Sequence, residues 1–312
     1  MSPFVTTRGD LLVEVTGADR VSYLDDVTTQ QLTGRAARTW TSALELDAHG
    51  AAVSAFDVVL LDDRLLLLAP TADAARDLVA RLGARTFLAD ASFAPSSLVT
   101  VCLRGPGAPA VAEEAELGVA CGRVEPRVGA LVIGRDGGVD VLVEPADVDE
   151  VVNRLVEHGA RRADPSVLDD WQVATGQPRW GHEIAPPHLP EELGLLASHV
   201  HLAKGCYPGQ EAVARMWMLG RPRRQLARIR ATGAVEAGWT AGEGRHRVQV
   251  TGVVDVDGDR VGLAFVPADS ARGARYEGEG GATVEVIEVV GADRPVPGHD
   301  PNVTRRRDQR GA

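Results

Sequence analysis

The chain has 312 residues, with 33 basic against 44 acidic side chains and a formal net charge of −11. Hydrophobic residues make up 44% of it, which is typical of a globular protein and excludes a disordered or fibrous one. The length favours two or three domains. The acidic balance argues against non-specific nucleic-acid binding as the main task.

No targeting or membrane-spanning segment is expected. The longest apolar runs, such as Leu65–Ala69, are far shorter than the roughly 20 residues that cross a bilayer. The first ten residues are polar and have no signal-peptide core. The three cysteines lie far apart, without a CxxC pair or metal-ligand spacing. We therefore expect a soluble, cytoplasmic protein without disulfides.

Strand and helix patterns alternate through the first two thirds of the chain. Asp10–Thr16 reads as a strand, and the helical stretch after Gly17 repeats apolar residues on one side at Val21, Leu24 and Val27. Residues 55–69 predict a buried hairpin, because both of its strands are apolar on both faces.

The next predicted helix has clear signals at both ends. Thr71 is a good N-cap, and Gly83 is expected to end the helix in the left-handed conformation. A similar strand–proline–helix unit recurs over residues 141–161, with Asp147 and Glu150 as a capping-box-like start and Gly159 as the stop. The two units either pack on one shared antiparallel sheet or are unrelated.

The pattern changes in the last third. Residues 183–196 contain three prolines and read as an irregular connector. Short strands then dominate, with a turn at Asp257-Gly258 and no helical period, which predicts a separate small β-barrel. The expected strands are Leu226–Ala231, His246–Val256, Arg260–Val266 and Thr283–Val290. The end of the chain is polar and rich in arginine and proline, which is typical of a disordered tail.

The most informative stretch reads KGCYPGQE and covers residues 204–211. Lys204, the only lysine beside 32 arginines, lies two residues before Cys206. A nearby cation favours the reactive thiolate form of a cysteine, and the turn residues around Cys206 expose it. A helix is expected to start at Gln210, and Arg215 on that helix is spaced to pair with Glu211.

Other readings of these residues remain open. An arbitrary cysteine is more often buried and structural, and we interpret Cys102 and Cys121 in that way. His199 and His201, if extended, could join Cys206 in a metal site, but a polar strand edge is the better interpretation and no metal is predicted. Five arginines crowd ten residues after the motif and form either an anion site or a solvated face: Arg221, Arg223, Arg224, Arg228 and Arg230.

With these residues in hand, the chain resembles the YgfZ family of folate-binding proteins, which is related to the glycine-cleavage T-protein, an aminomethyltransferase that depends on tetrahydrofolate. Residues 204–211, followed by AVAR and then Gly220 and Arg224, look like that family's signature. Looser similarity covers the N-terminal segment around Thr28, the Gly-Pro turn at 105–106 and the GQPRWG segment at 176–181.

The resemblance implies an α+β fold, a T-protein-like three-part ring with two α+β subdomains and a C-terminal β-barrel. The implied domains are a folate-binding domain at 1–222, made of two discontinuous subdomains, the barrel at 223–298 and the disordered tail at 299–312.

The resemblance also implies a role in assembling or maintaining iron–sulfur enzymes, including those that modify transfer RNA. Its implied ligand is tetrahydrofolate or a derivative, and its implied partners are iron–sulfur assembly proteins or client enzymes, without sequence-specific nucleic-acid or membrane binding. We expect a monomer. Cys206, Lys204 and Arg215 are the expected reactive group, and the expected folate contacts are Asp140, Thr28, Gln172, Tyr207 and Gln210.

The chain departs from the T-protein pattern at several positions. Ala55 stands where the T-protein has a catalytic aspartate, with Asp57 nearby, and Asp140 stands for its folate-holding glutamate. Gln172 replaces a frequent arginine, and Thr29-Gln30 replaces an Asn-Asp pair. A folate-dependent one-carbon transferase or demethylase, and a non-catalytic module for an acidic partner, are the alternative hypotheses.

Overall fold

The computed structural model describes residues 2–8, 12–219 and 222–292. The chain forms two compact units. The first comprises Met1–Asp25, Leu32–Ala43 and Ala55–Leu168, and the second comprises Asp26–Gln31, Leu44–Ser54 and Asp169–Ala312. None of the helices in the described ranges has the length and hydropathy to cross a membrane.

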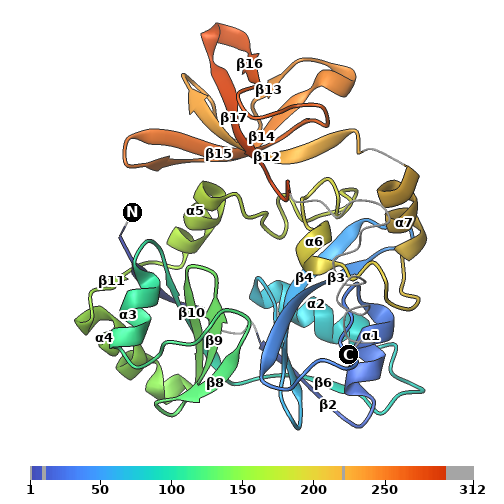
Figure 1. Cartoon of the computed structure of the whole chain (residues 1–312), viewed down its shortest axis with the longest axis vertical. Coiled ribbons are helices and arrows are strands. Elements are labelled where there is room, and N and C mark those ends of the chain that lie inside the picture. The colour runs from blue at the N-terminus through green and yellow to red at the C-terminus, as the bar shows by residue number, and fades with distance from the viewer. Residues whose placement is uncertain (1, 9–11, 220–221, 293–312) are drawn as a thin grey trace, which may run out of the picture. The chain divides into compact units, whose positions relative to one another are not determined.

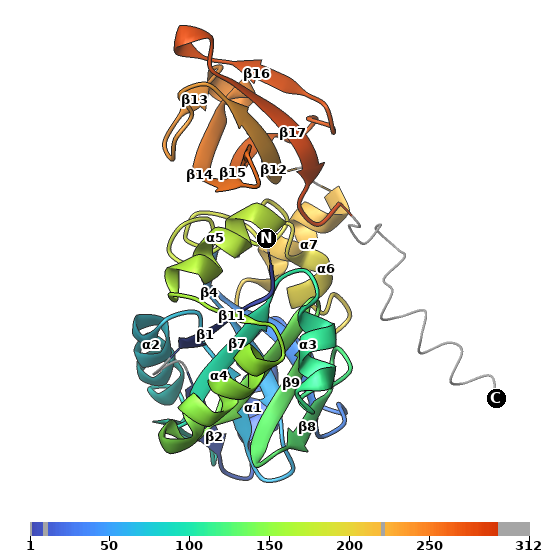
Figure 2. The same cartoon turned by 90° about the vertical axis from the view of Figure 1, so that its left-hand side faces the viewer.

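The first unit contains a six-stranded mixed sheet. Its order is β11 (Arg161–Arg162), β1 (Phe4–Arg8), β7 (Val99–Arg104), β10 (Gly138–Val143), β9 (Ala130–Arg135) and β8 (Val124–Arg127). The helices α3 (Ala108–Glu114) and α4 (Val148–Glu157) cover one face (Figure 2). Apolar side chains of β1, β7 and β10 pack beneath these helices and form a buried core, which removes their surface from water.

A second sheet has the order β3 (Thr39–Leu46), β4 (Ala52–Leu60), β5 (Leu65–Leu68), β2 (Leu12–Thr16) and β6 (Ser92–Pro95). The predicted hairpin is confirmed as β4 and β5, which pair antiparallel and are almost wholly buried. The predicted strand before Gly17 is confirmed as β2, although residues 10 and 11 lie outside the described ranges. In α1 (Arg20–Val27), Leu24 is buried as expected, whereas Tyr23 is buried in place of Val21 and Val27.

The helix α2 (Ala72–Gly83) starts as predicted, because the Thr71 hydroxyl accepts from the Ala74 amide at 3.1 Å. The prediction that Gly83 ends it in the left-handed conformation is wrong. Gly83 is the last residue of the helix itself, and Ala84 caps it in the right-handed conformation.

The shared-sheet interpretation of the two similar units is also wrong. The strand β5 lies in one sheet and β10 in the other, and the two sheets pack face to face through Leu66, Leu68, Ile133 and Leu142. In the later unit the short helix η1 (Pro145–Asp147) leads into α4, and the Asp147 side chain makes no capping bond. Gly159 does follow α4 with a φ of 103°, so that part of the prediction is confirmed.

The second unit carries α5 (Ser166–Thr175), which begins at the unit boundary, and then α6 (Leu196–His199) and α7 (Gln210–Leu219). The predicted late strands are confirmed as one antiparallel, barrel-like sheet (Figure 1), which also includes the short helices η2 (Gly244–His246) and η3 (Glu279–Gly281) in its loops. The sheet order is β13 (Thr240–Ala241), β14 (Val248–Val256), β15 (Asp259–Pro267), β12 (Arg224–Thr232), β17 (Thr283–Val289) and β16 (Arg275–Glu277).

The turn between β14 and β15 is the predicted one, with positive φ at Asp257 and Gly258. The predicted tail, residues 299–312, lies outside the described ranges. The expected domain limits at residues 222 and 298 stay a prediction.

Candidate functional site

Cys206 lies on the loop between α6 and α7 and is exposed to solvent. The helix α7 begins at Gln210, as the sequence predicts. The Gln210 side-chain oxygen accepts from the Tyr207 amide at 3.2 Å, so the loop folds back on the first residue of the helix. Arg215 and Glu211 form the predicted ion pair at 3.1 Å, with both side chains largely in solvent, where such a pair contributes little stability.

Lys204 is engaged with backbone groups far away in the sequence. Its Nζ donates to the carbonyl oxygen of Thr28 at 2.7 Å and to that of Gln30 at 3.0 Å. It also lies 5.3 Å from the centre of the Tyr207 ring, within the range of a cation–π contact. Thr28 is buried, and the group that contacts the lysine is its backbone carbonyl.

Two glycines explain how the loop reaches its position. Gly209 has a φ of +80°, and a Cβ there would lie 2.5 Å from the Asp47 carbonyl oxygen. Gly50 has a φ of +83°, and its Cβ would lie 2.7 Å from that of Ala212. The β3–β4 turn and the start of α7 therefore pack backbone against backbone, which side chains would prevent. Sequence reasoning missed this turn as part of the site.

Tyr207 is half-buried, and the carboxylate near its hydroxyl is that of Glu191. Burial raises the pKa of its hydroxyl well above the ordinary value, and the charge of Glu191 raises it further. The phenol therefore stays protonated and can donate a hydrogen bond. Gln172 lies on α5 and is also half-buried.

Asp140 lies in the first unit, buried on β10 between two arginines. Its two oxygens accept from Arg104 Nη2 and Arg135 Nε, each at 2.6 Å. Burial alone would raise the pKa of Asp140, but the two guanidinium groups outweigh burial and hold it far below its ordinary value. The carboxylate is therefore permanently charged at neutral pH.

The network continues to Asp57, which sequence reasoning named only as a neighbour of Ala55. Arg135 Nη1 donates to one Asp57 oxygen and the Ser42 hydroxyl to the other, both at 2.6 Å. Trp40 stacks on the Arg135 guanidinium, 4.0 Å from ring centre to Cζ. The Asp57 side chain is 25% exposed, whereas that of Asp140 is 5% exposed. Asp57 is therefore the carboxylate of this network that is more accessible to solvent. Ala55 is buried.

The other cysteines differ from each other. Cys102 is buried, as the structural interpretation expects, and burial together with the neighbouring Asp140 raises the pKa of its thiol to about 12. The interpretation of Cys121 as buried and structural is wrong, because it is exposed on a turn after α3.

No group of three or more His, Cys, Asp or Glu side chains is arranged to hold a metal ion within the described ranges. His199 ends α6, so His199 and His201 do not share one face of an extended strand as the metal interpretation requires.

Three of the five arginines after the motif are paired with acids, and Arg223 is exposed. Arg224 lies 3.3 Å from Glu192, Arg228 lies 3.7 Å from Glu288, and Arg230 lies 3.9 Å from Asp259. Arg221 lies outside the described ranges. This pairing favours the solvated-face interpretation over an anion site.

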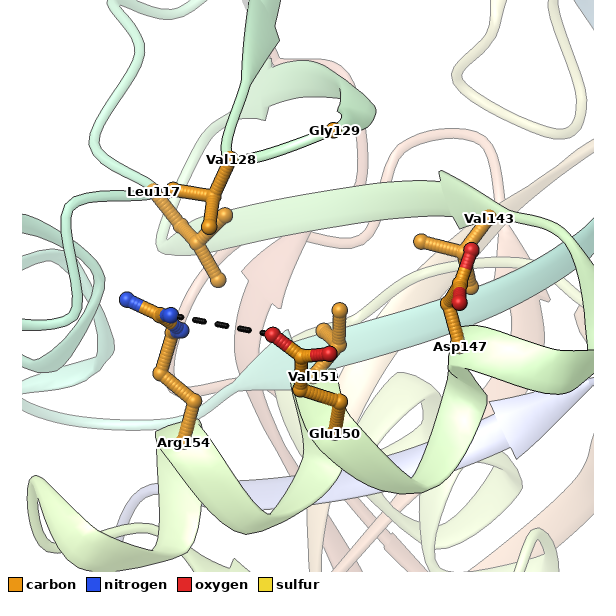
Figure 3. A pocket seen from close by; sticks show the side chains of 8 residues that line it. All are labelled: Leu117, Val128, Gly129, Val143, Asp147, Glu150, Val151 and Arg154. Carbon is orange, nitrogen blue, oxygen red and sulfur yellow. Dashed lines mark ion pairs between the residues drawn. The ribbon is translucent and has the colours of Figure 1, made fainter.

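The first unit also has a cavity of about 210 Å³ beside α4 (Figure 3). Leu117, Val143 and Val151 form its apolar part, and the ion-paired Arg154 and Glu150 lie at its rim. None of the predicted site residues lines it.

Among the predicted site residues, the structure brings Thr28, Lys204, Tyr207 and Gln210 together in the second unit. Asp140 belongs to the first unit.

Comparison with known proteins supports the fold. No family model matches the chain. Part of it, 54% of its length, is 28% identical to an aminomethyltransferase of Rubrobacter xylanophilus and spans 44% of that protein. A chloroplastic protein of Arabidopsis thaliana, named as a transferase, is 26% identical over 49% of the chain and 32% of its own length. The chain therefore spans less than half the length of these relatives.

The structural match is more extensive. The crystal structure of the glycine cleavage system aminomethyltransferase T from Bartonella henselae superposes with a TM-score of 0.78 at 18% identity, over 91% of this chain and 85% of that one. At this identity the similarity establishes architecture. The chain has the α+β fold of the aminomethyltransferase T-protein.

Proposed function

We propose that the chain is a tetrahydrofolate-binding accessory protein for the assembly or maintenance of iron–sulfur enzymes, including those that modify transfer RNA. In this proposal it acts in the cytoplasm as a monomer, and Cys206 is the working thiol. The observation that carries the proposal is the exposure of Cys206 on a loop that Lys204 and Gly209 anchor on both sides. The T-protein fold supports the folate part.

The residues take distinct roles in this proposal. Lys204 and Arg215 support Cys206, while Tyr207, Gln210, Gln172 and Thr28 line the folate side, as the resemblance implies. Asp140 is the proposed acceptor of pterin N–H groups, as the resemblance implies.

A cell-based assay tests the thiol. Cys206→Ala is expected to abolish an iron–sulfur-dependent transfer RNA modification, because alanine cannot form a bond to sulfur or to a metal. Cys121→Ala is the matched control, since it removes another exposed thiol and is expected to leave the modification unchanged. Full activity of Cys206→Ala would contradict the proposal.

Calorimetric titration with tetrahydrofolate tests the ligand. We expect the wild type to bind and Asp140→Ala to bind more weakly, with circular dichroism to confirm that the variant is folded. A folded wild type that binds no tetrahydrofolate would refute the folate half of the proposal.

A one-carbon transferase is the second candidate, because Asp57 is a partly exposed carboxylate held by Ser42 and Arg135. Its test is incubation with tetrahydrofolate and an aminomethyl thioether. Transfer would form methylene-tetrahydrofolate and release ammonia and the thiol, and Asp57→Asn should abolish it. Absence of turnover by the wild type would remove this candidate.

A further inference from the structure

The only lysine of the chain joins two segments that are distant in sequence. Its ammonium group donates to the carbonyl oxygens of Thr28 and Gln30, 176 and 174 residues away. The carbonyl between them, that of Thr29, accepts from the His201 amide at 2.9 Å. Three consecutive carbonyls of the segment 28–30 are thus bonded to residues 201–204.

The segment 28–30 is held from its other side as well. The Thr29 amide and hydroxyl both bond to the backbone of Leu44 on β3, at 3.0 and 2.8 Å. The Thr29 hydroxyl also donates to the His199 carbonyl at 2.6 Å. All three side chains of the segment are buried. The segment therefore lies between β3 and the chain that leads to Cys206.

The Cys206 loop has its second anchor at Gly209, whose Cβ position is closed by the backbone of Asp47. Cys206 lies between the two anchors and is exposed, as are Gly205 and Pro208. The Lys204 anchor depends on hydrogen bonds that a charge alone does not supply, because two N–H groups must reach two carbonyls at once.

We infer that Lys204 is a positioning residue, which fixes the Cys206 loop by clamping the segment 28–30, and that this segment belongs to the Cys206 site. The clamp replaces the electrostatic role expected from sequence, in which Lys204 favours the thiolate directly. The inference rests on the proposed function only in taking Cys206 as the working thiol.

Two measurements on the full chain separate the clamp from the electrostatic role. Hydrogen exchange of peptides covering 27–31 and 199–203 reports the clamp, and the pH profile of Cys206 alkylation by iodoacetamide reports the thiolate. A Cys121→Ser background leaves one exposed cysteine among the described residues. For Lys204→Met we expect exchange in both peptides to accelerate by about tenfold or more, because local opening is easier. The midpoint pH of alkylation should stay within about 0.3 units of wild type.

Chemical modification gives a sharper comparison, because the chain has one lysine. Reductive dimethylation keeps the positive charge but leaves one N–H donor, so it should accelerate exchange as Lys204→Met does. Lys204→Arg keeps the charge and several donors and should recover part of the protection. Arg230→Met, which removes one exposed positive charge on β12, is the matched control and should change neither measurement.

Two results would overturn the clamp. One is exchange at the wild-type rate in folded Lys204→Met. The other is a midpoint pH of alkylation that rises in Lys204→Met but stays at the wild-type value in Lys204→Arg and in the dimethylated protein. The positive charge alone would then account for the role of the lysine. Neither measurement uses folate, so a failure of tetrahydrofolate to bind counts against the proposed function and leaves this inference standing.

Discussion

Among individual residues, the three cysteines show how differently one side chain can behave in one chain. Cys102 is buried against Asp140, whereas Cys121 and Cys206 are exposed. Exposure alone therefore does not single out Cys206. What Cys206 has in addition is its place between Lys204, which bonds to Thr28 and Gln30, and Gly209, which packs on Asp47.

The thiols should differ in reactivity in a way that mass spectrometry can read. Burial raises the pKa of Cys102 to about 12, and its thiol therefore stays protonated and inaccessible at pH 8. Alkylation of the folded protein is expected to modify Cys121 and Cys206 and to spare Cys102 until the protein is unfolded in urea. Labelling of Cys102 in the native state at the rate of Cys206 would contradict its burial.

The two glycines of the motif should respond differently to alanine. Gly209→Ala places a Cβ 2.5 Å from the Asp47 carbonyl at positive φ, and it should lower the free energy of unfolding by about 1–3 kcal/mol. Gly205→Ala meets no atom within 4 Å and should change it by less than about 0.5 kcal/mol. Urea unfolding measures both, and equal stability of the two variants would disprove the close approach.

Among the secondary-structure elements, β9 and β10 matter most for the first unit, because they hold Arg135 and Asp140 side by side. Arg104 on the adjacent β7 completes the pair of cations. The buried carboxylate is stable there only because both of its oxygens are bonded to cations. Asp57 on β4 then extends the network to the neighbouring sheet of the same unit.

Asp140→Asn should therefore destabilise the protein, by about 3–5 kcal/mol, because it removes the negative charge that the two buried guanidinium groups share. Asp136→Asn, at the exposed turn of the same hairpin, is the matched control and should cost less than about 0.5 kcal/mol. Urea unfolding at pH 7 is the measurement, and similar values for the two variants would contradict the network.

The pH dependence gives a second check of the same network. The pKa of Asp140 lies below its ordinary value of 3.8, so the folded protein keeps the charge after the unfolded chain has become protonated. The advantage of wild type over Asp140→Asn should be constant above about pH 5 and shrink as the pH falls below about 4. A gap that grows toward acid pH would mean that the carboxylate is protonated in the folded state.

At the scale of the whole molecule, the chain has a net charge of −11. Part of its acidic excess lies beside the arginine-rich strand β12, where Glu192, Glu288 and Asp259 pair with three of the arginines. The pairs of Arg228 with Glu288 and of Arg230 with Asp259 have exposed carboxylates and add little stability. The pairs neutralise three of the cations that a polyanion could contact, and polyanion binding depends on the number of phosphates or sulfates neutralised.

The wild type should accordingly elute from a heparin column below about 0.15 M salt. A variant with Glu192→Gln, Asp259→Asn and Glu288→Gln exposes the three arginine charges and should be retained to higher salt. Equal retention of wild type and variant would show that the arginines already bind anions.

Much of the fold could be predicted because its signals are local. The hairpin 55–69, the Thr71 cap, the Asp257-Gly258 turn and the late strands depend on side-chain periodicity and on turn chemistry within a few residues. The Cys206 motif was visible for the same reason. The errors lie at three places: Ala84 rather than Gly83 caps α2, the short helix η1 precedes α4 in place of an Asp147 cap, and Cys121 is exposed.

The chain's local pattern is sufficient to specify its elements, an α+β class and one distinctive cysteine loop. Only the folded structure shows what Lys204 bonds to, which turn Gly209 packs against, and that Asp140 lies between two arginines. Arg135 and Asp140 are only five positions apart in one hairpin, whereas Arg104 lies 36 positions from Asp140 and Lys204 lies 176 positions from Thr28. Periodicity and capping do not extend over such separations, because the geometry there is set by how sheets and loops pack rather than by neighbouring residues.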